Sequence, residues 1–99
     1  MRYRWKSKID QLEAIFTLLI DHLKAKGIDS VDIDEDYYWN VPQASLYDPY
    51  HEPGQLEIGQ LSDDWNELSK LLEGKKVPLA YHLVWFAAIL RAIGGKVAG

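Results

Sequence analysis

Carboxylates gather in the middle of the chain with a spacing that raises the question of metal binding. Asp32, Asp34 and Asp36 alternate along the sequence, as oxygen ligands do at the start of an EF-hand calcium loop. Such a loop needs Gly at its sixth position and Glu at its twelfth, where this chain has Tyr37 and Gln43. We therefore predict no metal site. The run is either a solvated acidic edge or a docking surface for a basic partner.

Aromatic residues follow the acidic run directly. The five are Tyr37, Tyr38, Trp39, Tyr47 and Tyr50. Acidic and aromatic side chains together suit cationic groups, through salt bridges and cation–π contacts. Tyr and Trp are also frequent anchors of protein interfaces. The alternative is that these rings pack an irregular segment onto the rest of the fold.

A second group of acids, Asp63, Asp64 and Glu67, lies near the start of an expected helix. Asp64-x-x-Glu67 is similar to one half of the paired acidic motif that holds magnesium in pyrophosphohydrolases of the MazG type. The other half is missing, because residues 79–93 contain no acid. Metal-assisted phosphoryl chemistry is therefore disfavoured, and acids at this position also complement the helix dipole.

The remaining titratable residues show no catalytic pattern. His22, His51 and His82 lack the spacing of metal ligands. His82 and Arg91 share one apolar helix but project from opposite faces, since nine residues are about two and a half turns. We expect Arg91 to reach Asp63 or Asp64. No nucleophile elbow and no glycine-rich phosphate loop is present, so the sequence predicts no catalytic residue and no cofactor.

Basic residues mark the N-terminus, where Arg2, Arg4, Lys6 and Lys8 alternate with other residues. Such a strip can bind nucleic acid or an anionic membrane. It can equally be neutralised by the acidic segment of this molecule or of a second copy, which we consider the better interpretation.

Composition limits the class of protein. The chain has 99 residues, of which 47% are hydrophobic, and this favours a single folded domain over residues 1–99. It has no cysteine, which excludes disulfides and thiolate metal sites and favours the reducing cytoplasm. Residues 29–73 carry twelve acids and one Lys, a net charge of −11, which argues against nucleic-acid binding there.

Three helices can be predicted from hydrophobic periodicity. Trp5, Ile9, Leu12, Phe16, Leu19 and Leu23 follow spacings of four and three residues. They predict a helix over about residues 7–26, with Ser7 as a cap and Gly27 as its stop. A shorter helix is expected from Ser62, a natural N-cap, to Gly74. A third is expected from Pro78 to the glycine pair at 94–95.

The third helix is apolar nearly all round, so it should be buried by the other two. Its apolar stretch, residues 79–93, is shorter than the roughly 20 residues that cross a bilayer. Residues 28–61 contain three Pro and two Gly, which forbid a long helix. The sequence thus predicts a mainly α fold. It is a bundle of three or four helices around a buried C-terminal helix, and its irregular acidic and aromatic insert has room for one or two short strands.

Several stretches resemble a small uncharacterised bacterial protein family. They are Tyr37-Tyr-Trp-Asn-Val-Pro42, Glu52-Pro-Gly54, Gly59-Gln-Leu-Ser-Asp-Asp-Trp65 and Val84-Trp-Phe-Ala-Ala-Ile-Leu-Arg-Ala-Ile-Gly94. The resemblance implies a bacterial, cytoplasmic origin and transfers no catalytic residue.

Function follows less directly from these patterns than fold does. The leading hypothesis is a non-enzymatic interaction protein that binds a basic protein partner, in the manner of an immunity protein or antitoxin. Its binding residues would be Asp32, Asp34, Asp36, Tyr37, Tyr38, Trp39, Asp63, Asp64 and Arg91. The alternative is a small-molecule or enzymatic pocket formed by Tyr37, Trp39, Asp63, Asp64 and Arg91. A homodimer remains compatible with both hypotheses.

Overall fold

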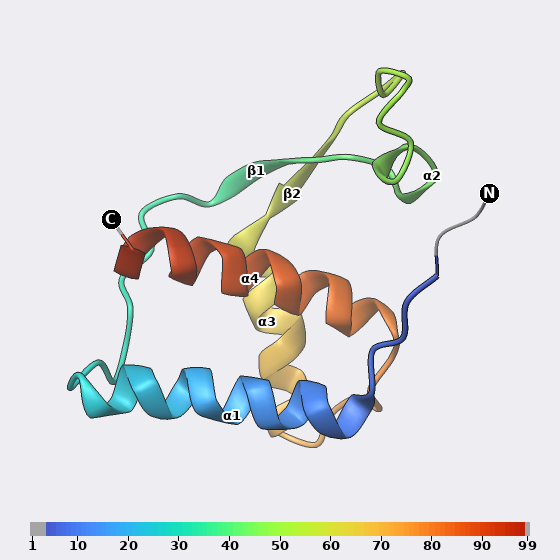
Figure 1. Cartoon of the computed structure of the whole chain (residues 1–99). Coiled ribbons are helices and arrows are strands. Elements are labelled where there is room, and N and C mark those ends of the chain that lie inside the picture. The colour runs from blue at the N-terminus through green and yellow to red at the C-terminus, as the bar shows by residue number, and fades with distance from the viewer. Residues whose placement is uncertain (1–3, 99) are drawn as a thin grey trace. The chain divides into compact units, whose positions relative to one another are not determined.

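The computed structural model describes residues 4–98 and divides into two compact units, Met1–Val31 and Asp32–Gly99. Within the described residues the chain is mainly α, with four helices and one two-stranded antiparallel sheet (Figure 1). The predicted fold class, mainly α with short strands in the insert, is confirmed. No helix in this part of the chain is both long and apolar enough to cross a membrane.

The first unit contains α1, Ile9–Ala25. It ends as predicted, because Gly27 adopts a positive φ of 79° and lets the N–H of Ile28 donate to the carbonyl of Leu23 at 3.1 Å. Its start differs from the prediction, since the N-cap is Lys8 and no side chain caps the first turn. The basic strip before it is described only from Arg4 onward, and Arg2 lies outside the described residues.

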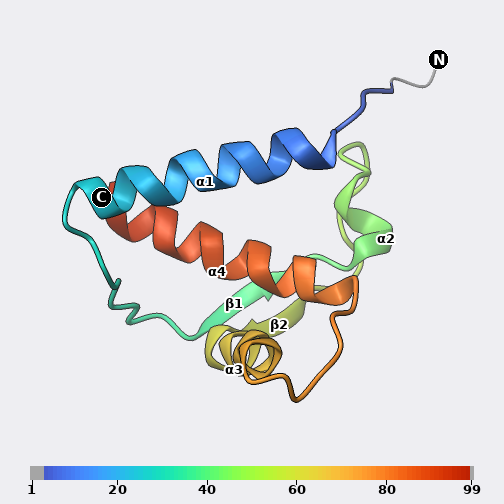
Figure 2. The ribbon, with the colours of Figure 1, turned by 90° about the horizontal axis from the view of Figure 1, so that it is seen from below.

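The second unit begins with the hairpin of β1, Tyr37–Asn40, and β2, Glu57–Gln60. The strands are antiparallel, with Tyr37 opposite Gln60 and Trp39 opposite Ile58. Their connection contains α2, a single turn at Gln43–Leu46. Figure 2 shows both strands beside the helices that follow.

Helix α3, Leu61–Leu72, continues directly from β2. Asp36 caps it from before β1, because one carboxylate oxygen accepts the backbone N–H of Ser62 at 2.8 Å and the other accepts the amide of Gln60 at 2.8 Å. The prediction of Ser62 as N-cap is therefore wrong: Ser62 lies within the helix, and the cap comes from a distant residue. Gly74 closes the helix with a φ of 71°, as expected.

Helix α4, Tyr81–Ala98, crosses α3 (Figures 1 and 2). It starts later than Pro78 and runs through Gly94 and Gly95, where the sequence predicted its end. Two glycines weaken a helix but do not forbid it. Lys96, in the last turn, is held by Glu35 at 2.9 Å from Nζ to Oε1, which ties that turn to the segment before β1.

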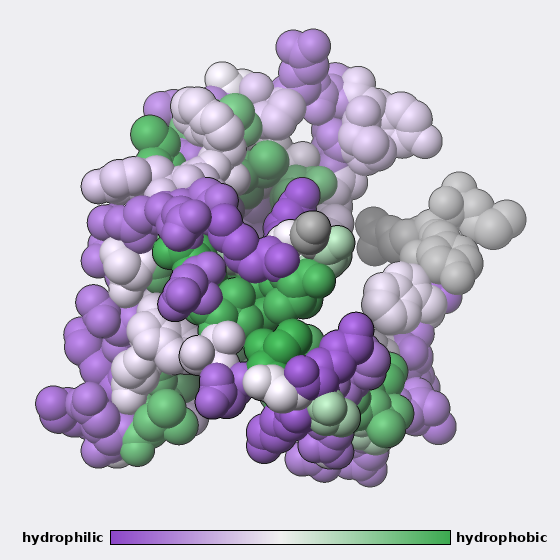
Figure 3. Space-filling model, turned by 90° about the vertical axis from the view of Figure 1, so that its left-hand side faces the viewer, coloured by the Kyte–Doolittle hydropathy of each residue, from purple (hydrophilic) through white to green (hydrophobic). Residues whose placement is uncertain are grey.

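Helix α4 was expected to be buried, but only two of its residues are, His82 and Ile89. Leu83 is 69% exposed, and Leu79 just before the helix is 62% exposed. This part of the prediction is wrong for the single chain, because α3 and the hairpin cover only part of the helix surface. Figure 3 shows hydrophobic side chains, in green, open on one face of the molecule among hydrophilic ones in purple.

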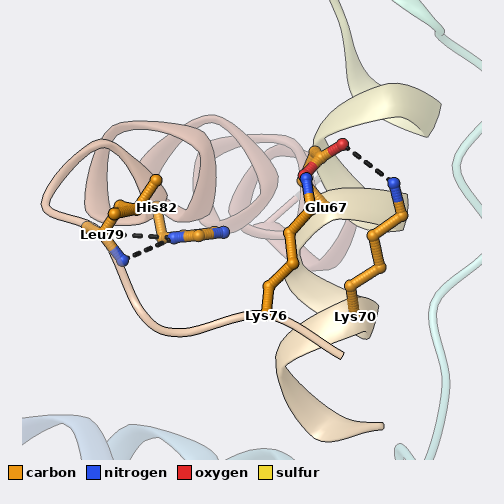
Figure 4. Close-up of polar contacts among 5 residues, drawn as sticks. All are labelled: Glu67, Lys70, Lys76, Leu79 and His82. Carbon is orange, nitrogen blue, oxygen red and sulfur yellow. Dashed lines mark hydrogen bonds and ion pairs between the residues drawn. The ribbon is translucent and has the colours of Figure 1, made fainter. Parts of the chain in front are cut away.

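The connection between α3 and α4 is fixed by an acid shared between two lysines. Glu67 on α3 accepts from Lys70 at 3.1 Å and from Lys76 of the connection at 2.7 Å (Figure 4). Hydrogen bonds from both lysines lower the pKa of Glu67, and the bond from Lys76 has the larger effect. Glu67 therefore has a structural role. The helix-dipole argument made from the sequence did not predict this role.

Candidate functional site

The hairpin has two unlike faces. Because paired residues in an antiparallel ladder share a face, Tyr37, Trp39 and Ile58 lie on one side and Tyr38 and Gly59 on the other. On the first face, Tyr37 is 68% exposed and Trp39 is 71% exposed. The second face turns toward α3, because the ring of Tyr38 reaches a carboxylate there.

That carboxylate belongs to Asp64, in the first turn of α3. The Tyr38 hydroxyl donates a hydrogen bond to Oδ2 of Asp64 at 2.7 Å. Gly59 makes room for the tyrosine ring: any Cβ at this position would collide with the ring of Tyr38. The glycine in β2 is thus required for the close approach of Tyr38.

Asp64 is 6% exposed, which is unusual for an acid in so small a protein. Burial raises its pKa above the ordinary aspartate value, the hydrogen bond from Tyr38 acts in the opposite direction, and the neighbouring charge of Asp63 raises it further. Burial also raises the pKa of the Tyr38 hydroxyl, and its bond to Asp64 adds to this shift. The tyrosine therefore stays a proton donor, and a positive charge nearby would stabilise the ionised carboxylate.

A pocket of about 330 Å³ opens beside this pair. We call it the acidic pocket. Its lining residues come from the hairpin, α3 and α4, and they are Tyr37, Tyr38, Asn40, Glu57, Ile58, Gly59, Gln60, Asp63, Asp64, Tyr81, Val84 and Trp85. Three are carboxylic acids, four are aromatic, and none is Lys, Arg or His.

Two of the aromatic side chains in the wall of the acidic pocket pack against each other. Tyr81 and Trp85, one turn apart on α4, form an edge-to-face pair with ring centroids 5.0 Å apart. Their rings lie with three acids around one small cavity. Such a cavity can hold a cation by charge and by ring quadrupole together, which water-exposed acids alone do poorly.

The acidic run before β1 is partly exposed, as expected of a solvated acidic edge, and partly engaged within the fold. Asp36 is used as the cap of α3, and the Gln60 amide and the Ser62 N–H lower its pKa. Glu35 and Asp34 face Lys96, at 2.9 and 3.6 Å from its Nζ. Hydrogen bonding to Lys96 lowers the pKa of Glu35. Three acids of this run thus have partners within the fold, although the side chains of Asp34 and Glu35 remain 86% and 60% exposed.

The structure unites some of the predicted binding residues and leaves others apart. Tyr37, Tyr38, Asp63 and Asp64 line the acidic pocket together. Trp39 and Arg91 do not line it, and Asp64 bonds to Tyr38 rather than to Arg91.

Other pocket residues escaped the sequence analysis. Glu57, Tyr81 and Trp85 were not predicted as site residues, although Tyr81 and Trp85 lie four apart on one helix, a spacing that places two side chains on one face. If this aromatic pair had been considered together with the nearby acids, this face of α4 would have been predicted as part of the site. The position of Glu57 depends on the strand register and had no such signal.

Metal chemistry has no support in this geometry. Within residues 4–98 no cluster of three or more His, Asp or Glu side chains could hold a metal ion. Asp34 and Asp36 contact different partners, Lys96 for the first and Gln60 and Ser62 for the second.

The chain matches no protein family model, no curated protein and no solved structure. The resemblance to a small bacterial family therefore stays a prediction, and function must be argued from the pocket itself.

Proposed function

We propose that this chain is a non-enzymatic interaction protein that binds a basic partner protein, with the acidic pocket receiving one cationic side chain. One observation carries the proposal: three carboxylates and four aromatic rings line a cavity that has no basic residue in its wall. Buried Asp64 lacks a cationic partner there, and a guanidinium or ammonium group supplies one.

The exposed hairpin face extends the same surface. Tyr37 belongs both to the pocket wall and to this face, which it shares with Trp39 and with Ile58, the strand partner of Trp39. Large exposed aromatic side chains are typical anchors of protein interfaces. A partner that places a Lys or Arg in the pocket would cover these rings as well, which is how an immunity protein or antitoxin meets a basic target. The lack of cysteine suits an encounter in the cytoplasm.

The direct test uses two small probes that differ only in charge. N-acetylarginine amide should shift the NMR resonance of the Trp85 indole N–H, and N-acetylcitrulline amide, which is uncharged, should not. The shift should weaken when sodium chloride is raised from low to about 0.5 M, because the pair is only partly shielded from solvent. An equal response to both probes would rule out charge recognition.

Matched variants separate the pocket from the rest of the acidic surface. Asp64→Asn keeps an oxygen for the Tyr38 hydroxyl but removes the charge, so the chain should fold and lose the arginine response. Asp32→Asn removes an exposed acid outside the pocket and serves as the control with the same change in net charge. A full response in Asp64→Asn would place binding elsewhere.

A cationic small molecule is the second candidate, favoured by the three acids and four aromatic rings that line so small a pocket. It predicts that a free amine or guanidine binds without any contribution from the hairpin face. Trp39→Ala separates the two, since it should weaken a protein partner and leave a small cation unaffected.

A further inference from the structure

A second cavity lies between α3 and α4, and its character is the opposite of the first. This apolar groove has a volume of about 660 Å³, within the range of small-molecule sites. Its walls include Trp65, Leu68 and Leu72 of α3, and Leu79, Leu83 and Phe86 from the other side. None of its lining residues is Lys, Arg, Asp or Glu.

Two polar side chains, Ser69 and His82, interrupt this apolar lining. His82 contributes to the groove wall and is only 5% exposed. Its Nδ1 accepts the backbone N–H of Leu79 at 2.9 Å, which fixes the side chain at the start of α4 (Figure 4). The ring also packs edge-to-face against Trp85, with centroids 5.2 Å apart.

The contacts of Nδ1 with Leu79 bear on the tautomer of His82. Nδ1 lies 2.9 Å from the backbone nitrogen of Leu79 and 3.3 Å from its carbonyl oxygen. A backbone N–H can only donate, so the shorter contact favours the tautomer in which Nδ1 accepts and Nε2 carries the proton. Figure 4 shows the His82 ring extending from α4 toward α3, with Nε2 at the tip of the ring. Nε2 is buried, and it has no hydrogen-bond partner among residues 4–98.

A buried N–H without an acceptor is costly, and native proteins rarely keep one. Here it lies beside an open apolar groove, and an oxygen atom brought by a ligand would satisfy it. We propose that the groove binds an uncharged, largely apolar small molecule that carries one hydrogen-bond acceptor, such as a ketone or ester oxygen, which pairs with Nε2–H of His82.

Charge supports an uncharged ligand over a fatty acid. The groove wall has no formal charge, and the lysines next to it are already paired. Lys76 contacts Glu67 at 2.7 Å, and Lys75 contacts Glu73 at 2.8 Å. A carboxylate would have to break one of these pairs. Because Nε2 is buried, entry of the oxygen requires a side chain of the groove to move.

The experiment compares two probes of nearly equal shape, butyrophenone and butylbenzene, which differ by a carbonyl in place of a methylene. With the full chain, the ketone should bind about tenfold more tightly in a fluorescence or NMR titration, as expected for one buried hydrogen bond. The proton resonance of His82 Nε2–H should shift with the ketone and stay in place with the hydrocarbon.

Two variants keep the proposal falsifiable, with folding of each confirmed by circular dichroism. His82→Asn retains an acceptor near the position of Nδ1 for Leu79 but has nothing at Nε2, so it should lose the preference for the ketone. His82→Gln places an amide donor near the position of Nε2 and should recover part of it. Leu83→Asp, which puts a charge in the groove wall, should abolish binding of both probes.

Other outcomes overturn the proposal. Equal affinity for the two probes in the wild-type chain removes the role of His82. No binding of either probe removes the ligand site. Light scattering is measured alongside: a dimer that Leu83→Asp dissociates, with no probe binding, would show that a second copy of the chain covers the groove instead.

Discussion

The acidic pocket and the apolar groove differ in what holds them together. The acidic pocket is assembled from residues far apart in sequence, with Tyr38 on a strand bonded to Asp64 on a helix. The groove is formed by two consecutive helices and their connection, and its one polar contact joins His82 to a residue three positions earlier. Changes in the hairpin should therefore damage the first cavity and spare the second.

Helix α4 serves both cavities with neighbouring residues. His82 lines the groove and Trp85 lines the acidic pocket, and the two rings are in edge-to-face contact. The two sites are physically adjacent although their chemistry is opposite. The predictions below test whether they are also energetically separate.

The largest effect is expected at Gly59. Gly59→Ala places a methyl group against the Tyr38 ring, so the ring must move and its bond to Asp64 must break. We expect a loss of about 2–3 kcal/mol in the free energy of unfolding, measured with urea. The arginine response should vanish while butyrophenone still binds; loss of both would show that the two cavities share one packing unit.

Removing only the hydroxyl should have the next largest effect. Tyr38→Phe leaves buried Asp64 without its donor, at a cost of about 1–2 kcal/mol. The same change made in an Asp64→Asn background should cost less, because no buried charge is then left unpaired. Equal costs in both backgrounds, measured as urea midpoints, would mean that the bond is not coupled to the charge.

Loss of the distant cap should be milder. Asp36→Ala removes the acceptor for the Ser62 N–H and the Gln60 amide, and the midpoint temperature should fall by a few degrees. Asp36→Asn keeps an acceptor oxygen, so its midpoint temperature should fall less. A temperature unchanged in both variants would show that water replaces this cap without loss.

The pH dependence of the Asp64 contribution has a definite sign. Its folded-state pKa is raised, so the group favours the folded state at pH below its unfolded value near 4 and loses this contribution as pH rises. Asp64→Asn has no such titration. Its stability relative to wild type should therefore increase as pH is raised from 3 to 6, in paired urea titrations. The opposite trend would indicate that the carboxylate is stabilised by its surroundings.

The smallest effect belongs to Lys96. Its contacts with Glu35 and Asp34 are largely exposed, and such pairs contribute little. Lys96→Gln should leave both probe affinities unchanged and fray only the last turn of α4, seen as faster hydrogen exchange there. A change in arginine binding would extend the acidic pocket to this segment.

The sequence was informative where local periodicity decides structure. The stripe of α1 and the glycines that end α1 and α3 were predictable, because spacing and positive φ are local properties. The course of α4 was not, because its glycine pair indicated a stop and the helix runs through this pair to Ala98.

The site was less predictable than the fold. Asp63, Asp64, Tyr37 and Tyr38 were identified by residue type, yet their convergence depends on the register that sets Gly59 opposite Tyr38. The neighbours of Arg91 could not be predicted from the sequence either, because the position of a residue on a helical face does not show which element packs against that face. Residue chemistry was thus visible in the sequence, and the partners of each residue were not.

The central claim is that the acidic pocket holds a cation, and crystals of the chain grown with N-acetylarginine amide test it most directly. The account predicts a guanidinium group among Asp63, Asp64 and the ring of Trp85, with the Tyr38 hydroxyl still on Asp64. An empty pocket at saturating probe, or a guanidinium bound only at Asp32 and Asp34 on the exposed run, would contradict it.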